Sequence, residues 1–104
     1  MIDQVISKHG VPIRLTDERW AHITEEHAEL AGYRQEVLAT VDAPERIYAG
    51  NAGERLAVRA LEPGKFLAVV YREGASDGFI ITAFLTRRTR SLERREALWT
   101  SQPS

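Results

Sequence analysis

The 104-residue chain contains no cysteine, which excludes disulfide bonds, thiolate metal ligands and cysteine nucleophiles. It has no run of about 18 apolar residues, the length that a membrane-spanning helix needs. Its first residues lack the basic start and long apolar stretch of a secretory signal peptide. Together these absences predict a soluble cytoplasmic domain with no membrane partner.

The short motifs of several enzyme classes are also missing. Neither a phosphate-binding P-loop nor a dinucleotide-binding glycine pattern occurs. His22 and His27 are five positions apart, so they miss the His-Glu-x-x-His zinc spacing and would lie on different helix faces. No Gly-x-Ser-x-Gly elbow is present. We therefore expect no metal site, no cofactor and no serine hydrolase.

What the chain does contain is enough apolar material for one compact core, at 43% of residues. Its length fits one domain over residues 1–104, and neither a repeat nor a linker divides it. We expect a short extended arm over about residues 1–15, because Pro12 disfavours a helix before it, and a frayed end over about 100–104.

Charge is unevenly distributed along the chain, although the net charge is only −1. Residues 1–54 carry 10 acids and 5 bases, whereas residues 55–104 carry 5 acids and 9 bases. Twelve of the 14 basic residues are arginine, which codon usage in a GC-rich genome or a need for forked phosphate donors would explain equally well. The asymmetry is a first indication of a polyanionic partner.

Hydrophobic periodicity predicts the order helix, helix, four strands, helix. Apolar spacings of three and four favour helices over about residues 16–30, capped by Thr16 or Asp17, and over about 33–41. A period of two then predicts strands at 46–50, 55–61, 65–72 and 79–86, and residues 91–99 are typical of a last helix. The expected fold is α+β, with two N-terminal helices packed on one face of a four-stranded antiparallel sheet, followed by a C-terminal helix.

Strand alternation predicts which side chains share a face. If Glu62 pairs with Lys65, then Arg59 lies opposite Ala68 and Arg55 lies opposite Arg72. Pairing Arg72 with Ile80 across the next loop sets Val70 opposite Thr82. The expected core face consists of Leu56, Val58, Leu67, Val69, Tyr71, Phe79, Ile81, Ala83 and Leu85. The other face gathers Arg55, Ala57, Arg59, Ala68, Val70, Arg72, Ile80, Thr82, Phe84 and Thr86.

That second face is either an ordinary solvent face or an anion site. Opposed Arg55 and Arg72 would repel each other without an anion between them, which slightly favours the anion site. His27 belongs to the apolar stripe of the first helix, where a histidine is more often a packing residue than a catalyst. If it reached the arginine face, a titrating group would stand beside phosphate-binding donors, the minimum for metal-free RNA cleavage through the 2′-hydroxyl.

Four segments carry a family resemblance: residues 13–30, 33–38, 65–72 and 77–86, including the two histidines and Gly-Phe-Ile-Ile-Thr-Ala at 78–83. Together they resemble a family of small prokaryotic and phage proteins assigned to the barnase–EndoU–colicin–RelE nuclease fold. The resemblance covers about residues 10–99. It implies a four-stranded antiparallel sheet behind N-terminal helices and metal-independent RNA cleavage.

By position, His27 resembles the polar residue of the family's helix, Arg59 and Arg72 its strand cations, and Thr82 and Thr86 its last-strand hydroxyls. We expect His27, Arg59, Arg72 and Thr82 to be catalytic. The predicted substrate-binding residues are Arg55, Thr86, Arg87 and Arg88.

The leading hypothesis is therefore a metal-independent endoribonuclease with RNA as its partner, in the role of a toxin–antitoxin or phage-conflict toxin. An acidic antitoxin or immunity protein would then cover the arginine face. The alternatives are a catalytically inactive RNA-binding domain and a protein-interaction module on the same fold.

Overall fold

The computed structural model describes residues 2–101 and begins with a hairpin of strands β1 (Ile2–Ile6) and β2 (Pro12–Thr16). Helix α1 (Asp17–Glu26), the 3-10 helix η1 (Ala28–Leu30) and helix α2 (Arg34–Asp42) follow. The chain continues through β3 (Arg46–Ala49), β4 (Arg55–Glu62), β5 (Lys65–Glu73) and β6 (Gly78–Thr86). It ends with the short helix α3 (Arg90–Glu93) and strand β7 (Ala97–Thr100).

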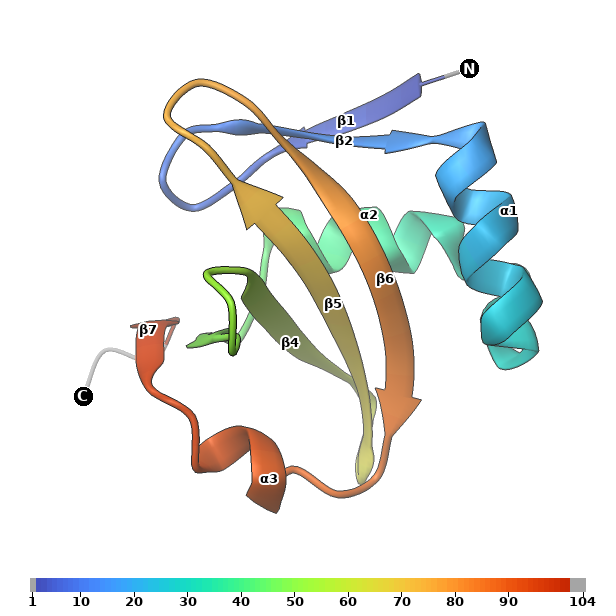
Figure 1. The fold of residues 1–104 in the computed structure, drawn as a ribbon. Coiled ribbons are helices and arrows are strands. Elements are labelled where there is room, and N and C mark those ends of the chain that lie inside the picture. The colour runs from blue at the N-terminus through green and yellow to red at the C-terminus, as the bar shows by residue number, and fades with distance from the viewer. Residues whose placement is uncertain (1, 102–104) are drawn as a thin grey trace.

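The strands form one seven-stranded mixed sheet in the order β1-β2-β6-β5-β4-β3-β7. In Figure 1 the β1–β2 hairpin crosses the upper end of β6, where Ile13 and Arg14 pair in parallel with Gly78 and Phe79. All other pairings between described strands are antiparallel. The α+β class stands, but the prediction of a four-stranded antiparallel sheet with two N-terminal helices is wrong.

The N-terminal arm is one source of that error, because it folds as a hairpin. Alternation of exposed and half-buried residues in β1, and burial of Ile13 and Leu15 in β2, give this segment a strand period of two. Gly10 adopts φ +83° in the connecting turn, a backbone conformation that glycine enters without strain.

The C-terminal segment is the other source. The predicted helix over 91–99 ends at Glu93, and β7 pairs with β3 instead, with Trp99 opposite Ile47. Thr100 belongs to β7, so the predicted frayed end does not begin there. The rest of that prediction, residues 102–104, lies outside the described residues.

The two N-terminal helices were located from sequence to within a few residues. The Thr16 hydroxyl caps α1 by accepting a hydrogen bond from the Arg19 backbone N–H at 3.0 Å. The helix ends at Glu26, because His27 adopts φ −131° and ψ 74°, and one turn of η1 completes the predicted span.

Two apolar clusters lie on the two faces of the sheet. On the face covered by α1 and α2, which we call the α1/α2 face, Ile23 and Val41 pack against Val69 and Tyr71. On the opposite face, which we call the α3 face, Leu92 of α3 packs against a smaller cluster. The sheet residues of this smaller cluster are Tyr48, Leu56, Val58 and Ala68, with Phe66, Val70 and Phe84 partly buried beside them.

Two register irregularities change which residues share a face. Glu62 pairs with Lys65 as predicted, but a shift between Ala60 and Glu62 places Arg59 opposite Leu67 and Arg55 opposite Tyr71. This shift moves all of β4 by one residue, so its whole side-chain set changes face. The predicted grouping of Arg55 and Arg59 with Arg72 is therefore wrong, and Leu56 and Val58 leave the expected core for the α3 face.

The second irregularity lies in β6, between its pairings with Val70 and Tyr71 of β5. Val70 pairs with Thr82 as predicted, but Tyr71 pairs with Ile80 and Arg72 with Phe79, which leaves Ile81 as the extra residue. Ile80 is consequently buried on the α1/α2 face, whereas Phe79, expected in the core, is 41% exposed.

Tyr71 provides a pH-dependent test of this core. Its side chain is fully buried, and its hydroxyl finds no hydrogen-bond partner among the described residues. Burial raises the pKa of Tyr71 from 10.0 to about 12, with Glu73 adding to the rise and Arg55 opposing it. Because the folded pKa lies above the unfolded one, the stability linked to this group is present below pH 10 and is lost as the pH rises toward 12.

We expect Tyr71→Phe to leave stability at pH 7 unchanged or slightly higher, because the lost hydroxyl had no partner. The wild-type chain should lose on the order of 2 kcal/mol through this group between the two pKa values, and the variant should not. Urea unfolding at several alkaline pH values measures the difference, with Tyr33→Phe as the control at a half-exposed tyrosine. Equal alkaline losses in Tyr71→Phe and the wild type would contradict this account.

Candidate functional site

The α3 face carries two hollows, one on each side of Leu92. Helix α3 has four residues, and Leu92, 5% exposed, is its buried member. Leu92 lines both hollows, so the helix stands between them as a shared wall. The segment that connects β6 to β7 thereby becomes part of the sheet face that an incoming ligand would meet.

The larger hollow, of about 280 Å³, combines an apolar floor with a polar rim. Leu56, Val70 and Phe84 of the sheet form the floor together with Leu92. The rim consists of Glu54, Thr86, Arg88, Ser91 and Arg95. A flat apolar floor with guanidinium and hydroxyl groups around it suits a ligand that joins an uncharged ring to a phosphate.

The loop between β3 and β4 forms one side of this hollow and is held by two arginines. The Arg95 Nη1 atom donates to the Asn51 side-chain oxygen at 2.8 Å and to the Ala49 carbonyl at 3.2 Å. From the sheet, Arg72 Nη1 donates to the Ala52 carbonyl at 3.1 Å. These bonds fix the loop and leave the other guanidinium N–H groups for further partners.

Glu54 is the carboxylate of this hollow. Its Oε1 atom accepts a hydrogen bond from the Ala52 backbone N–H at 2.7 Å. Backbone N–H groups of Ala52 and Glu54 lower the pKa of Glu54, and nearby Arg72 and Arg95 lower it further. The side chain is therefore an anion at neutral pH, placed among cations.

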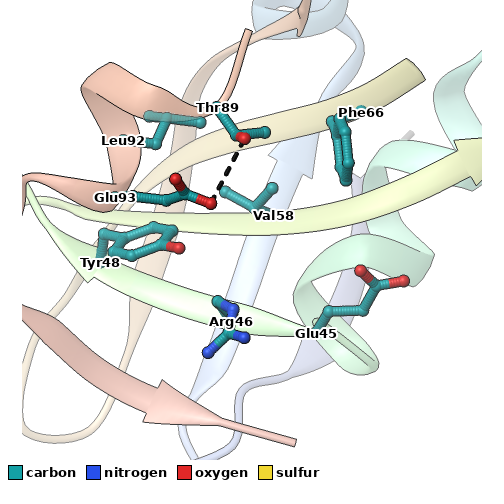
Figure 2. A pocket seen from close by; sticks show the side chains of 8 residues that line it. All are labelled: Glu45, Arg46, Tyr48, Val58, Phe66, Thr89, Leu92 and Glu93. Atoms are coloured by element: carbon teal, nitrogen blue, oxygen red, sulfur yellow. Dashed lines mark hydrogen bonds between the residues drawn. The ribbon is translucent and has the colours of Figure 1, made fainter. Parts of the chain in front are cut away.

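The smaller hollow, of about 80 Å³, lies on the other side of Leu92. Figure 2 shows Tyr48, Val58 and Phe66 of the sheet facing α3, with the Thr89 hydroxyl donating to Glu93 Oε2 at 3.4 Å. Burial raises the pKa of Tyr48, and Glu93 contributes in the same direction while Arg46 opposes it. Tyr48 pairs across strands with Leu56 of the larger hollow, so a neutral phenol stands at the boundary of the two.

A dense group of cations runs along the rim of the α3 face. Residues 87–95 contain five arginines and one acid, Glu93. Within the described residues 2–101, no hydrogen bond or ion pair engages the side chains of four of these arginines: Arg87, Arg88, Arg90 and Arg94. Their guanidinium groups are available for an anionic partner.

Two of the sequence-predicted site residues lie on the α1/α2 face instead. Arg59 lines a hollow beside α2 together with Tyr33, Glu36, Glu62 and Lys65. The two carboxylates beside Arg59 make this hollow less suited to a polyanion than the rim of the α3 face. Arg55 lies opposite Tyr71 on the same α1/α2 face and influences the pKa of that tyrosine.

His27 lies where α1 ends, at the border of the sheet. Beyond the short β2 pairing, α1 runs beside β6, as the Arg19 bond to the Ile81 carbonyl at 3.4 Å shows. His27 Nδ1 lies 3.5 Å from Glu29 Oε2, and the side chain is 33% exposed. The described part of the chain contains no bond or ion pair between His27 and Arg59, Arg72 or Thr82.

The other predicted residues belong to the α3 face or its rim. Thr82, Thr86 and Arg72 lie on this face by register, and Arg87 and Arg88 follow directly after β6. The Thr82 hydroxyl is buried and finds no partner among the described residues. The Thr86 hydroxyl bonds the Arg88 backbone at 3.0 Å and thereby shapes the turn that presents Arg88.

Sequence reasoning missed Tyr48 and Glu54 as functional candidates, and it noted Arg95 only as one of the clustered arginines after the last strand. Glu54 was the last acid of the acidic half and Arg95 one of a run of arginines, and neither stood out by spacing. The fold brings Tyr48 and Glu54 to one face through β3 and β4, while α3 delivers Arg95. A signal was nevertheless present, because arginines are concentrated in residues 87–95.

Among residues 2–101, no group of three or more His, Asp or Glu side chains is placed to hold a metal ion. In the same residues, no helix is long and apolar enough to cross a membrane.

No family model matches the chain, no curated protein matches it, and no solved structure matches it. The family resemblance seen in the sequence therefore remains a prediction.

Proposed function

We propose that the α3 face binds RNA and cleaves it without a metal ion. The observation that carries this proposal is the larger hollow, where Arg88, Arg95 and Thr86 surround an apolar floor. Single-stranded nucleic acid offers the complementary features, a phosphate backbone and flat bases. The overall net charge of −1 implies that binding depends on this local arrangement.

The apolar floor of the larger hollow contacts a base, and its polar rim contacts phosphate. Phe84 gives a base an aromatic surface, and base–aromatic stacking contributes about 1–3 kcal/mol. Arg88 and Arg95 donate to phosphate oxygens, with a geometry that suits bidentate contacts. Arg87, Arg90 and Arg94 belong to the same segment as Arg88 and Arg95 and add positive charge beside the hollow.

The cleavage step needs a proton acceptor, a charge stabiliser and a proton donor. We assign Glu54 as acceptor of the 2′-hydroxyl proton, after which the 2′-oxygen bonds to phosphorus and the bond from phosphorus to the 5′-oxygen breaks. Arg88 and Arg95 stabilise the charge that builds on the phosphorane. Tyr48 lines the smaller hollow on the other side of Leu92, so we assign to water the proton that the leaving 5′-oxygen takes up. The products are a 2′,3′-cyclic phosphate and a 5′-hydroxyl.

RNA binding without cleavage is the second candidate, and a specific observation favours it. Two arginines near Glu54 already bond the β3–β4 loop, and their charges help to keep the pKa of Glu54 low. A carboxylate with a lowered pKa is a weaker base at neutral pH. Such an arrangement would bind phosphate firmly and turn over slowly.

A cleavage assay on single-stranded RNA in EDTA tests the catalytic proposal. The wild-type chain should produce fragments with cyclic phosphate ends, and Glu54→Gln should cut at least about 100-fold more slowly while still binding RNA. His27→Ala and Arg59→Ala serve as comparison variants, because the sequence predicts both as catalytic and neither side chain lines the larger hollow. Intact RNA with the wild type, together with retained binding, would leave the binding-only candidate.

The predicted roles as toxin and as partner of an acidic antitoxin or immunity protein belong to this same proposal. The arginine-rich segment 87–95 is the surface that an acidic partner would cover, and covering it would block the larger hollow. An antitoxin of that kind would compete with RNA for the α3 face.

A further inference from the structure

Strand β1 forms an open edge of the sheet. It stands at one end of the strand order, with β2 on its inner side and no described strand on its outer side. The Ser7 N–H donates to the Val11 carbonyl at 2.9 Å, so odd-numbered residues of this strand direct their backbone groups toward β2. The backbone N–H and C=O groups of Ile2, Gln4 and Ile6 consequently point outward, free to pair with another strand.

The exposed apolar side chains of the described chain gather at this same end of the sheet. Among residues 2–101, the large apolar side chains with high exposure are Ile2 at 61%, Ile6 at 48% and Phe79 at 41%. Ile2 and Phe79 line one surface hollow of about 220 Å³ together with Arg14 and Arg19. Exposed apolar groups on an open edge strand are the usual mark of a surface that another strand covers.

Natural edge strands are normally protected by a lysine, a proline, a bulge or an inward-pointing charge. β1 has no lysine and no proline, and its pairing with β2 is regular from Ile2 to Ile6. Its one charged residue, Asp3, accepts a hydrogen bond from Arg34 Nε of α2 at 2.8 Å and is thereby turned to the α1/α2 face. The outer edge is therefore unprotected.

The two isoleucines of β1 lie symmetrically about its central residue, Gln4. Read from either end, the sequence Ile-Asp-Gln-Val-Ile places an isoleucine two positions from the glutamine. We propose that β1 pairs antiparallel with β1 of a second copy of this chain, with the two-fold axis at Gln4. Each Ile2 then lies opposite Ile6 of the other copy, and the two Gln4 residues face each other as a hydrogen-bonded pair.

This pairing accounts for both the unpaired backbone groups and the exposed isoleucines of the β1 edge. The outward backbone groups of Ile2, Gln4 and Ile6 gain partners, and the two apposed isoleucine pairs cover apolar surface that each copy exposes alone. The dimer joins two sheets into one continuous sheet and leaves both α3 faces open. A five-residue strand buries a modest area, so the dimer forms reversibly and depends on concentration.

Sedimentation velocity over a dilution series measures the association, and paired charge variants locate it. The wild type should shift from monomer to dimer as concentration rises. The double variant Ile2→Lys with Ile6→Lys places like charges at both apposed pairs and should remain monomeric throughout. The double variant Ile2→Glu with Ile6→Lys places opposite charges at the same pairs and should restore the dimer. Circular dichroism melting verifies that each variant folds.

A cross-link tests the register directly. The chain has no cysteine, so Gln4→Cys introduces a single thiol, and a hydrogen-bonded antiparallel pair has a Cα separation of about 5.5 Å, within disulfide range. Mild oxidation should convert most of this variant to a covalent dimer. Gln35→Cys, at an exposed position of α2, controls for random collision and should cross-link far less.

Three results would overturn the proposal. A wild type that stays monomeric at every concentration removes the dimer itself. A dimer that survives Ile2→Lys with Ile6→Lys places the interface elsewhere. Failure of the opposite-charge variant to dimerise, or equal cross-linking of Gln4→Cys and Gln35→Cys, excludes the two-fold register at Gln4. None of these results bears on RNA binding by the α3 face.

Discussion

Replacing Arg88 and Arg95 together with alanine is expected to weaken RNA binding by at least about 100-fold at low salt, because each charge-assisted hydrogen bond contributes about 1.5–3 kcal/mol and about 1.4 kcal/mol corresponds to tenfold in affinity. Both side chains lie at the rim of the larger hollow of the α3 face. The Arg88 guanidinium makes no hydrogen bond or ion pair among the described residues, so its replacement breaks no contact within the protein. Fluorescence anisotropy with a labelled single-stranded RNA measures the change. Repeating it at several salt concentrations should show a slope reduced by about 1.4, since two phosphate contacts are removed.

The matched control is Arg55→Ala with Arg59→Ala. It removes the same formal charge from β4, but on the α1/α2 face, where Arg59 has Glu36 and Glu62 beside it. We expect this control to change affinity by less than about threefold, because distant exposed charges are screened by salt. Equal losses in the two double variants would mean that total charge, and not the α3 face, governs binding.

The second large effect concerns Leu92, which attaches α3 to the sheet. A four-residue helix has no stability of its own, so α3 depends on the packing of its one buried side chain, to which the Arg95 bonds just after the helix add. Leu92→Ala should lower the free energy of unfolding by about 2–5 kcal/mol, as is usual for a buried leucine. Because the hollows share Leu92 as a wall, the same variant should also lose most of its RNA affinity.

Urea unfolding and amide hydrogen exchange together test this prediction. Exchange in residues 87–95 should become faster in Leu92→Ala, whereas the central strands β4, β5 and β6 should keep their protection relative to global stability. Arg94→Ala, an exposed change in the same turn, should leave both measurements close to the wild type. An unchanged urea midpoint in Leu92→Ala would contradict the role assigned to this residue.

The local features of the fold could be predicted from sequence. Apolar spacing located α1 and α2, the Thr16 cap was among the two candidates, and the near-continuous apolar runs located β5 and β6. These features depend on residues close in sequence, whose periodicity and capping chemistry are visible directly. The number of strands was wrong, because β1, β2 and β7 are short segments whose state depends on the partner strands they meet.

The site was predicted less well for a related reason. One extra residue in β4, near Leu61, reverses the face of every β4 side chain, and alternation alone cannot reveal where such a bulge lies. Arg55 and Arg59 were consequently assigned to the wrong face. By contrast, Thr86 at the end of β6 pairs with Phe66 beyond the irregularity of that strand and lies on the sheet face expected from alternation, and Arg88 follows two residues later.

The most direct measurement of the central claim is an NMR titration of the wild-type chain with a 2′-O-methyl oligoribonucleotide, which can bind but cannot be cleaved. We expect amide shifts to change around Glu54, Phe84 and residues 86–95, with little change around Tyr33, Glu36 and Arg59. Shift changes centred on the α1/α2 face, or no shift changes with RNA in excess, would contradict this expectation.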